Sequence, residues 1–314
     1  MIEMPRISVV TPSFNQGQFL DATIRSVLDQ DYPNLEYMVV DGGSTDNSVD
    51  VIEKYADRLA WWVSEPDNGQ TDAINKGLRR STGDIVAYLN SDDLYEPGAF
   101  WRVAEYFEQH PEVDLVYSDL TVIDAEGRRK QVWKSRPFNV AVQLCRNFIF
   151  QPTVFIRRRV LDALESFDPA LHYVMDVDFW YRASLSFNFA YLHEPLAMFR
   201  LHDESKTGGS RIPFVREREV ILERFFRQCR DQRVLRQESR IRSWHNYHGA
   251  EQLYSGGEIS EARSHFLKAM KLDLFSFRTP ASVAGVLDSM AGFRLFPLVR
   301  ARLGKWIERE LWNQ

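Results

Sequence analysis

The 314-residue sequence is poor in cysteine, with only Cys145 and Cys229, which lie far apart in the chain. Two such residues supply neither a disulfide framework nor a zinc site built from paired Cys-x-x-Cys motifs. A chain without disulfides is typical of a reducing compartment. The first ten residues, MIEMPRISVV, also lack the basic segment and apolar core of a signal peptide. We therefore expect a cytoplasmic protein.

Long apolar runs and glycine-rich turns are missing as well. No stretch approaches the roughly 18 apolar residues that span a bilayer, so a membrane contact would have to be peripheral, at the inner face. The first predicted strand is followed by TPSFNQG, which is not the glycine-rich turn of a dinucleotide-dependent oxidoreductase. Nucleotidyl transfer to a sugar phosphate would need a basic, glycine-rich loop near the N-terminus. Both functions are disfavoured.

The charge of the chain is unevenly distributed. Residues 215–314 carry 18 Lys and Arg against 12 Asp and Glu (+6), and residues 1–214 carry 21 against 32 (−11), which gives the net charge of −5. An acidic body has little affinity for phosphate backbones, so we expect no nucleic-acid partner. Solvated helix faces are the simplest explanation of the basic C-terminal region.

Hydrophobic periodicity predicts alternating strands and helices in the first part of the chain. We expect strands at residues 6–11, 35–41, 59–65 and 84–90, with amphipathic helices between them. This alternation is typical of an α/β fold with a mostly parallel sheet and helices on both faces. From residue 97 onward we expect a helix to His110, a strand at 113–120, a hairpin, and a strand in QPTVFIRR.

The C-terminal third is expected to be helical, which divides the chain into an α/β domain at 1–212 and an α-helical region at 213–314. One helical hairpin there resembles a single tetratricopeptide repeat, on the pattern Tyr254, Gly257, Ala262, Phe266 and Ala269. The last segment, 296–314, is amphipathic and basic. It packs on the body in the simplest interpretation, and a membrane-surface or partner contact is the alternative.

Three polar clusters fall at the ends of predicted parallel strands: Thr11-Pro12-Ser13, Asp41-Gly42-Gly43, and Asn90 to Asp93. Ligands of open α/β sheets bind beyond the carboxyl ends of the strands. Asp92 and Asp93 would repel each other unless a cation joined them. Mg²⁺ or Mn²⁺, shared with a diphosphate, fits such a pair, and a capped turn is the alternative explanation.

Several separated motifs decide between these alternatives. In order and spacing, TPSFNQGQFL, VVDGGSTDNS, EPDNGQTDAINKG, YLNSDD and MDVDFW resemble the family 2 glycosyltransferases with the GT-A fold. The resemblance covers residues 6–205. It implies a GT-A catalytic domain, a nucleotide-sugar donor, a divalent metal (Mg²⁺ or Mn²⁺), and a saccharide or lipid-linked saccharide acceptor.

The resemblance also assigns residues to the donor. It places Thr11, Pro12 and Ser13 against the base and ribose, and Asp41 as the acceptor of a hydrogen bond from the base. The residues expected to border the rest of the donor pocket are Asp67, Asp72, Asn75, Lys76, Asn90 and Ser91. Capping of a helix is the alternative role of Asp72. Arg200 or Lys206 would cover phosphate charge.

For the metal, the resemblance implies Asp92 and Asp93, with His202 as a further ligand. The first acidic position of the family's motif is Asn90 here, so the two aspartates must take over its duty. A histidine satisfied by the backbone is the alternative for His202. The catalytic base matches Asp176, at the start of a predicted helix, with Asp178 as its rival. One of these two aspartates could instead serve only to cap that helix.

The function expected from this resemblance is inverting, metal-dependent transfer of a sugar, from a UDP-linked donor in the first instance, onto a hydroxyl group. The expected setting is surface polysaccharide biosynthesis. The acceptor side is assigned only to Asn147 and Gln151, with Trp133 or Trp180 stacking on a sugar. A non-catalytic nucleotide-binding scaffold that recruits partners through its helical region is the alternative.

Overall fold

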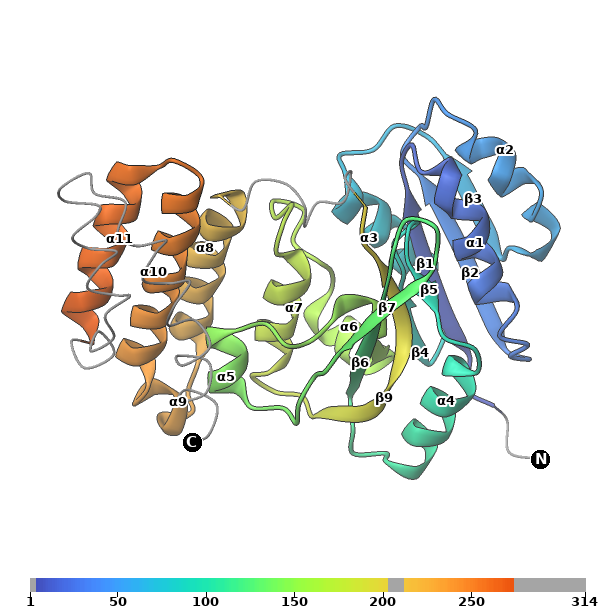
Figure 1. Ribbon diagram of the computed structural model, residues 1–314. Helices are drawn as coiled ribbons and strands as arrows, with labels where there is room; N and C mark the ends of the chain where they lie inside the picture. Colours follow the sequence, from blue (N-terminus) through green and yellow to red (C-terminus); the bar gives the residue numbers. More distant parts are fainter. Residues whose placement is uncertain (1–3, 203–211, 274–314) are drawn as a thin grey trace. The chain divides into compact units, whose positions relative to one another are not determined.

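The computed structural model of the protein describes residues 4–202 and 212–273. The chain divides into two compact units, Met1–Gly208 and Gly209–Gln314. The first unit is built on one sheet and the second on helices (Figure 1). The domain boundary predicted at residues 212 and 213 stays a prediction.

The first half of the sheet is parallel, as the sequence predicts. Its strands are β1 (Ile7–Ser13), β2 (Leu35–Asp41), β3 (Trp61–Ser64) and β4 (Ile85–Tyr88), in the spatial order β3-β2-β1-β4. The connecting helices are α1 (Gly17–Leu28), α2 (Ser48–Glu53) and α3 (Gln70–Arg80), and a 3₁₀ turn, η1 (Ala56–Arg58), precedes β3. This half is a succession of βαβ units.

The second half of the sheet is mixed. Its strands are β5 (Leu94–Tyr95), β6 (Leu115–Ile123), β7 (Arg129–Trp133), β8 (Phe155–Arg157) and β9 (Phe189–Arg200). The order continues from β4 through β8, β6 and β9 to β5, and β7 pairs with β6. Of these pairs only β6 with β9 is parallel. The remaining elements are α4 (Ala99–Gln109), α5 (Val140–Cys145), η2 (Gln151–Thr153), α6 (Arg158–Leu164) and α7 (Met175–Ala183).

Alternate residues of the parallel strands face two different helix layers. Ile7 and Val9 of β1 belong to the apolar core that α1 and α4 cover. Val10 points to the other face, where α3 packs on β1 and β2. A Cβ placed on Gly77 of α3 would lie 2.4 Å from Val10 Cγ1, so only glycine lets the helix approach this closely. The α/β class with helices on both faces of the sheet is therefore confirmed.

Strand register places the predicted functional loops at one edge. Ser13 pairs with Asp41, and Asp41 pairs with Ser64, at the carboxyl ends of β1, β2 and β3. Val10 pairs with Tyr88 at the end of β4. Because all four strands run in the same direction, their C-terminal loops meet at this edge.

The second unit contains α8 (Ile212–Gln228), α9 (Gln232–Leu235), α10 (Glu238–Ser255) and α11 (Ile259–Leu272). Helices α10 and α11 form a hairpin around Gly257, whose φ of 89° suits glycine. Ala250 and Phe266 form its small core. The hairpin is present where the sequence predicts one, and its likeness to a tetratricopeptide repeat stays a prediction. The amphipathic segment 296–314 lies outside the described residues.

Candidate active site

The loop after β2 is organised by the carboxylate of Asp41. This buried side chain accepts hydrogen bonds from the backbone amides of Gly43 (3.1 Å) and Ser44 (2.8 Å), and from the hydroxyls of Ser44 (2.5 Å) and Ser64 (2.7 Å). Four donors thus hold it at the ends of β2 and β3. Its predicted contact with the nucleotide base would have to be added to these bonds, and it stays a prediction.

The loop after β1 presents the other predicted base-binding residues. Thr11 is buried and its hydroxyl accepts a bond from Tyr37 of β2 (3.0 Å). Pro12 is also buried. The hydroxyl of Ser13 is buried and has no hydrogen-bond partner within the part of the chain that is described. Since unpaired buried hydroxyls are uncommon, Ser13 is the member of the three with bonding capacity left over.

Charged residues around the start of α3 are held by local contacts. The Asp67 carboxylate accepts from the amide of Gly69 (2.8 Å) and lies against Gly42, where a Cβ would come within 2.7 Å of its Oδ2. The Asp72 carboxylate, in the first turn of α3, accepts from the backbone amide of Asn68 (3.1 Å), which precedes the helix. Lys76 forms an ion pair with Glu65 (2.7 Å). Asp67, Asp72 and Lys76 are therefore held by local contacts near the start of α3, and their predicted contact with the donor stays a prediction.

Asn75 has a contact that the sequence does not reveal. Its amide nitrogen donates to the carbonyl of Phe167 (2.8 Å), and its amide oxygen accepts from the Phe167 backbone nitrogen (3.1 Å). One turn earlier, the hydroxyl of Thr71 contacts the Leu171 carbonyl and the sulfur of Met175. Helix α3 thereby holds the segment that leads into α7. Asn75 contributes two hydrogen bonds to this segment, one donated and one accepted by its side-chain amide.

The turn after β4 is held by a network of amide side chains. Asn90 accepts from Gln70 Nε2 (2.6 Å), and its own Nδ2 lies 3.4 Å from both Gln151 Oε1 and Asp93 Oδ2. Gln151 in turn donates to the Tyr88 carbonyl (2.8 Å). Asn90, at the position where the family has an acidic residue, therefore joins three separate elements around the aspartates.

Asp92 and His202 face each other in this site. The distance between Asp92 Oδ2 and His202 Nε2 is 3.0 Å. The Asp92 side chain is 18% exposed, whereas that of His202 is 6% exposed. The imidazole also packs on the ring of Phe19 from α1 (centroids 4.7 Å apart). A carboxylate oxygen and a ring nitrogen are thus presented together at the edge of the sheet.

Asp93 lies behind Asp92 and is fully buried. Its Oδ1 accepts from the backbone amide of Arg200 (3.0 Å). Burial raises the pKa of the Asp93 carboxyl well above its ordinary value, and the negative charge of Asp92 raises it further. Thr23 of α1 holds the turn itself, because its hydroxyl contacts the carbonyls of Ser91 (2.8 Å) and Asp93 (2.9 Å).

Arg200 braces this turn from the end of β9. Its Nε donates to the Asp92 carbonyl (2.9 Å), and its Nη1 lies within bonding distance of the carbonyls of Asp124 (3.3 Å) and Ala125 (2.8 Å) in the β6–β7 turn. The guanidinium also lies over the Phe19 ring (4.8 Å). Arg200 is only 4% exposed, so these contacts assign it a bracing role. Its predicted contact with phosphate stays a prediction.

The donor set fits a hard divalent cation. Among the residues that the structure describes, no three His, Cys, Asp or Glu side chains form a metal-binding cluster. Asp92 and His202 supply two neighbouring ligands, with Asp93 behind them. Mg²⁺ and Mn²⁺ sites of this kind use few protein ligands and complete the shell with water and substrate phosphates. The residues present are therefore compatible with such a metal.

The two candidate bases are in different environments. Both lie in the first turn of α7. Asp178 is 2% exposed and forms an ion pair with Arg182 one turn later (2.8 Å). Asp176 is partly exposed, and its charge, together with that of Asp93, adds to the effect of burial in raising the pKa of Tyr88 well above its ordinary value. Asp176 and Asp93 therefore lie around the same tyrosine.

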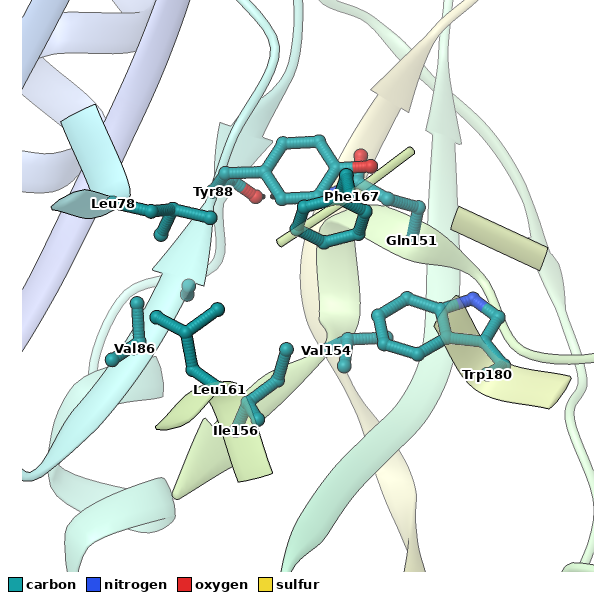
Figure 2. Close-up of a pocket in the computed structure, with 10 residues that line it drawn as sticks. Leu78, Val86, Tyr88, Gln151, Val154, Ile156, Leu161, Phe167 and Trp180 are labelled. Atoms are coloured by element: carbon teal, nitrogen blue, oxygen red, sulfur yellow. Dashed lines mark hydrogen bonds between the residues drawn. The ribbon is translucent and has the colours of Figure 1, made fainter. Parts of the chain in front are cut away.

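A small cavity lies on the inner side of that tyrosine. Its volume is about 10 Å³, and its wall consists of Tyr88, Gln151 and mainly apolar side chains from β4, β8, α6 and α7 (Figure 2). A space of this size holds at most one water molecule. It is therefore a packing defect beneath the site and not a sugar pocket.

The predicted acceptor residues are dispersed. Gln151 belongs to the amide network, and Asn147 Oδ1 accepts from Gln143 (2.7 Å) near α5. Trp133 packs on Phe150 and Phe199, and Trp180 is fully buried against Phe167 and Phe179. Trp180 is closed off by this burial, whereas Trp133 is half-buried, and the acceptor assignment of each stays a prediction. Lys206 lies outside the described residues.

Phe14 lies at the candidate site, although the sequence pattern did not single it out. It follows β1, between Ser13 and Asn15, and is 60% exposed. A large exposed aromatic side chain at a ligand-binding edge offers a flat apolar face for a base or sugar. The sequence feature that could have identified Phe14 is its position in TPSFN, where a large aromatic residue stands among the residues of the first polar cluster.

Comparisons with known proteins agree with this geometry. Residues 8–164, half of the chain, match the model of Glycosyl transferase family 2. An uncharacterized glycosyltransferase of Nostoc sp. (strain PCC 7120) is 30% identical over 63% of this chain and 65% of its own length. A PGL/p-HBAD biosynthesis glycosyltransferase of Mycobacterium bovis is 30% identical over 56% of this chain and 68% of its own. The chain thus spans just under two thirds of the first of these relatives.

Two solved structures have the same fold. S. aureus TarS 1–349 in complex with UDP superposes with a TM-score of 0.68 at 18% identity, over 95% of this chain and 92% of that one. The mannosyltransferase PcManGT from Pyrobaculum calidifontis, in complex with GDP-Man and Mn²⁺, gives a TM-score of 0.63 at 17% identity, over 100% and 89%. At these identities the likeness concerns the fold. The sheet edge, its polar loops and the family match together lead to one conclusion: the chain belongs to glycosyl transferase family 2.

Proposed function

We propose that the protein is an inverting, metal-dependent glycosyltransferase that moves a hexosyl group from a nucleotide-diphosphate donor to an acceptor hydroxyl. The observation that carries this proposal is the pairing of Asp92 with His202 at 3.0 Å, on the same edge of the sheet as Asp41 and Ser13. The charges of Asp176 and of the buried Asp93 both raise the pKa of Tyr88, which supports their proximity to the same side chain. These neighbours support a metal, a nucleotide and a general base acting at one edge of the sheet.

The donor is a UDP-sugar in this proposal. The base would lie over the loop after β1, where Ser13 has an unpaired hydroxyl and Phe14 an exposed ring, and near Asp41. Relatives in fold support a nucleotide-sugar donor without fixing the base, because TarS was solved with UDP and with UDP-GlcNAc, and PcManGT with GDP-Man. Asp67, which lies against Gly42, and Lys76, which pairs with Glu65, would border the diphosphate.

Asp92 and His202 would hold Mg²⁺ or Mn²⁺, and Asp93 would support them from behind. When bound, such an ion neutralises the charge that builds on the departing diphosphate. Arg200 and Asn90 keep the two aspartates in place through the contacts described above. Of the two aspartates, Asp92 is therefore the proposed metal ligand, because its carboxylate is the more exposed one.

Asp176 would act as the general base. At the N-terminal turn of α7 its carboxylate takes the proton of the acceptor hydroxyl as the oxygen attacks the anomeric carbon, opposite the leaving diphosphate. No covalent glycosyl-enzyme is needed, and the configuration inverts. Asp178 already bonds to Arg182, so it is the weaker candidate. The acceptor is a saccharide or lipid-linked saccharide in surface polysaccharide biosynthesis, on the cytoplasmic side.

Calorimetric titration with UDP, GDP and dTDP, each with and without Mn²⁺, tests this proposal. Tight binding of one nucleotide that requires Mn²⁺ is expected. The Asp92→Asn variant should lose the metal dependence, whereas Asp57→Asn, at an exposed site in η1, should not. Metal-independent binding would contradict the role of Asp92. Binding without any turnover of a matching nucleotide-sugar would favour the non-catalytic scaffold instead.

A further inference from the structure

The second unit carries a concentrated set of exposed arginines that the transfer reaction does not use. We name this set the arginine corner. Its members, all exposed, are Arg224, Arg227, Arg230, Arg233, Arg236 and Arg240. They span the end of α8, the whole of α9 and the first turn of α10, three elements that follow one another at a junction of the helical unit (Figure 1). Within residues 224–240 the only acidic side chains are Asp231 and Glu238, which leaves a net charge of +4.

Half of these arginines, Arg230, Arg236 and Arg240, form no ion pair with a carboxylate of the described residues. Arg227 pairs with Glu223 (3.4 Å) and Arg233 with Asp231 (2.8 Å). Arg230 donates to the carbonyls of Arg227 and Cys229 near the end of α8. Arg236 and Arg240 form no ion pair within the described residues. Such a dense group of like charges costs free energy by self-repulsion unless an anionic partner accepts it.

The face of α8 that leads into the corner also exposes an apolar side chain. Val220 is 46% exposed and precedes Arg224 by four residues and Arg227 by seven. Positions at this spacing share one helix face. An apolar side chain beside several guanidinium groups suits the boundary between lipid headgroups and acyl chains. A polynucleotide would use the arginines but not the valine.

We propose that the arginine corner binds the surface of an anionic lipid bilayer. Four to eight basic residues clustered on helices are sufficient for recognition of anionic headgroups. No helix among the described residues is long and apolar enough to cross a membrane, so a contact of this kind would be peripheral. Binding of the arginine corner to anionic headgroups does not depend on whether the chain transfers a sugar.

Vesicle co-sedimentation of the full chain tests the proposal. Binding is expected to vesicles of phosphatidylcholine mixed with phosphatidylglycerol, and not to phosphatidylcholine alone. It should decrease strongly when the salt is raised from about 0.1 M to about 1 M, because the screening length shortens from about 10 Å to about 3 Å. Equal binding to both kinds of vesicle, or no binding to either, would overturn the proposal.

Two variants of equal charge locate the surface. Arg230→Gln/Arg236→Gln/Arg240→Gln removes three cations from the corner. Arg263→Gln/Lys268→Gln/Lys271→Gln removes three exposed cations from α11. At roughly fivefold per arginine, the corner variant should bind anionic vesicles on the order of a hundredfold more weakly, and the α11 variant should bind as the natural chain does.

An equal loss in both variants would mean that net charge alone drives binding and would overturn the assignment to the corner. Salt-dependent binding to a polynucleotide, with no binding to vesicles, would overturn the lipid proposal and identify nucleic acid as the partner of the arginine corner. Circular dichroism of each variant checks that the helices are retained. Calorimetry with UDP and Mn²⁺ reports separately on the donor site, so failure of the lipid proposal and failure of the transferase proposal are distinguishable.

Discussion

Asp93 combines a structural cost with a functional role. Its carboxyl is fully buried beside Asp92, and both burial and the neighbouring charge raise its pKa. We expect Asp93→Asn to stabilise the metal-free protein at neutral pH by about 1–3 kcal/mol, because an amide does not carry the cost of burying an ionisable carboxyl, whether as a charge or as a retained proton. The same change should weaken Mn²⁺-dependent nucleotide binding. Chemical denaturation without metal and calorimetry with Mn²⁺ measure the two effects.

The pH dependence of unfolding gives a second measurement of the same carboxyl. A folded-state pKa above the unfolded value of about 3.9 means that the folded chain retains a proton that the unfolded chain has released. The contribution of Asp93 to the free energy of unfolding should therefore decrease as the pH rises from about 4 through its folded pKa, by up to about 1.4 kcal/mol per pH unit. In Asp93→Asn this slope should be absent. An unchanged slope would contradict the assignment.

Asp176 and Asp178 are expected to have different roles because their contacts differ. Asp176→Asn should retain UDP binding and reduce transfer by about 10²–10⁴-fold, which is the usual contribution of a general base. Asp178→Asn breaks the ion pair with Arg182 and should lower stability while leaving a measurable rate. Steady-state kinetics with calorimetry on both variants checks this. The reverse pattern would exchange the two roles.

At the scale of single elements, α3 connects the donor edge with the base. Asn75 bonds twice to the backbone of Phe167, in the segment before α7. We expect Asn75→Ala to destabilise the protein by about 1–3 kcal/mol, since two buried backbone groups lose their partner. Transfer should decrease more than nucleotide binding, because Asp176 is displaced and Asp41 is not. The control is Asn68→Ala, at an exposed position just before the same helix. A larger loss of UDP binding than of transfer in Asn75→Ala would refute the connection.

The predictability of each element depends on the range of its contacts. The strands β1 to β4 and their polar ends follow from local periodicity, because parallel strands joined by short crossovers leave few alternatives. The antiparallel pairs of β8 and the two-residue strand β5 were not predicted, since partners far away in sequence define them. The same holds in the site: Asp92 and His202 were visible as motifs, whereas the bonds of Asn75 and Arg200 join segments about 90 residues apart or more.

For the whole molecule, two units with separate apolar cores should respond separately to ligand. The sheet unit has its own core cluster, and the helical unit has smaller ones around Phe266 and Leu253. Nucleotide with Mn²⁺ at about 100 times its Kd should stabilise the first unit by about 2.7 kcal/mol. Scanning calorimetry should then show one transition raised by about 5–10 °C and another unchanged.

Asp92→Asn provides the control for that experiment, because without the metal contact the first transition should not move. The arginine-corner variant should show the normal shift. A single transition that moves as a whole would show that the two units unfold together, and the separation drawn from their cores would then be wrong.

The position of β9 has a consequence for how the protein is made. This strand lies between β6 and β5, two strands that leave the ribosome before it. Its last residue holds Asp93 across 107 positions of the chain. A growing polypeptide already contains Asp92 and Asp93 of the turn after β4. It cannot form the pairs of β6 and β5 with β9 until β9 has been synthesised. Chains that stall before Arg200 lack the amide that holds the Asp93 carboxylate, so the turn after β4 is not completed in unfinished products of translation.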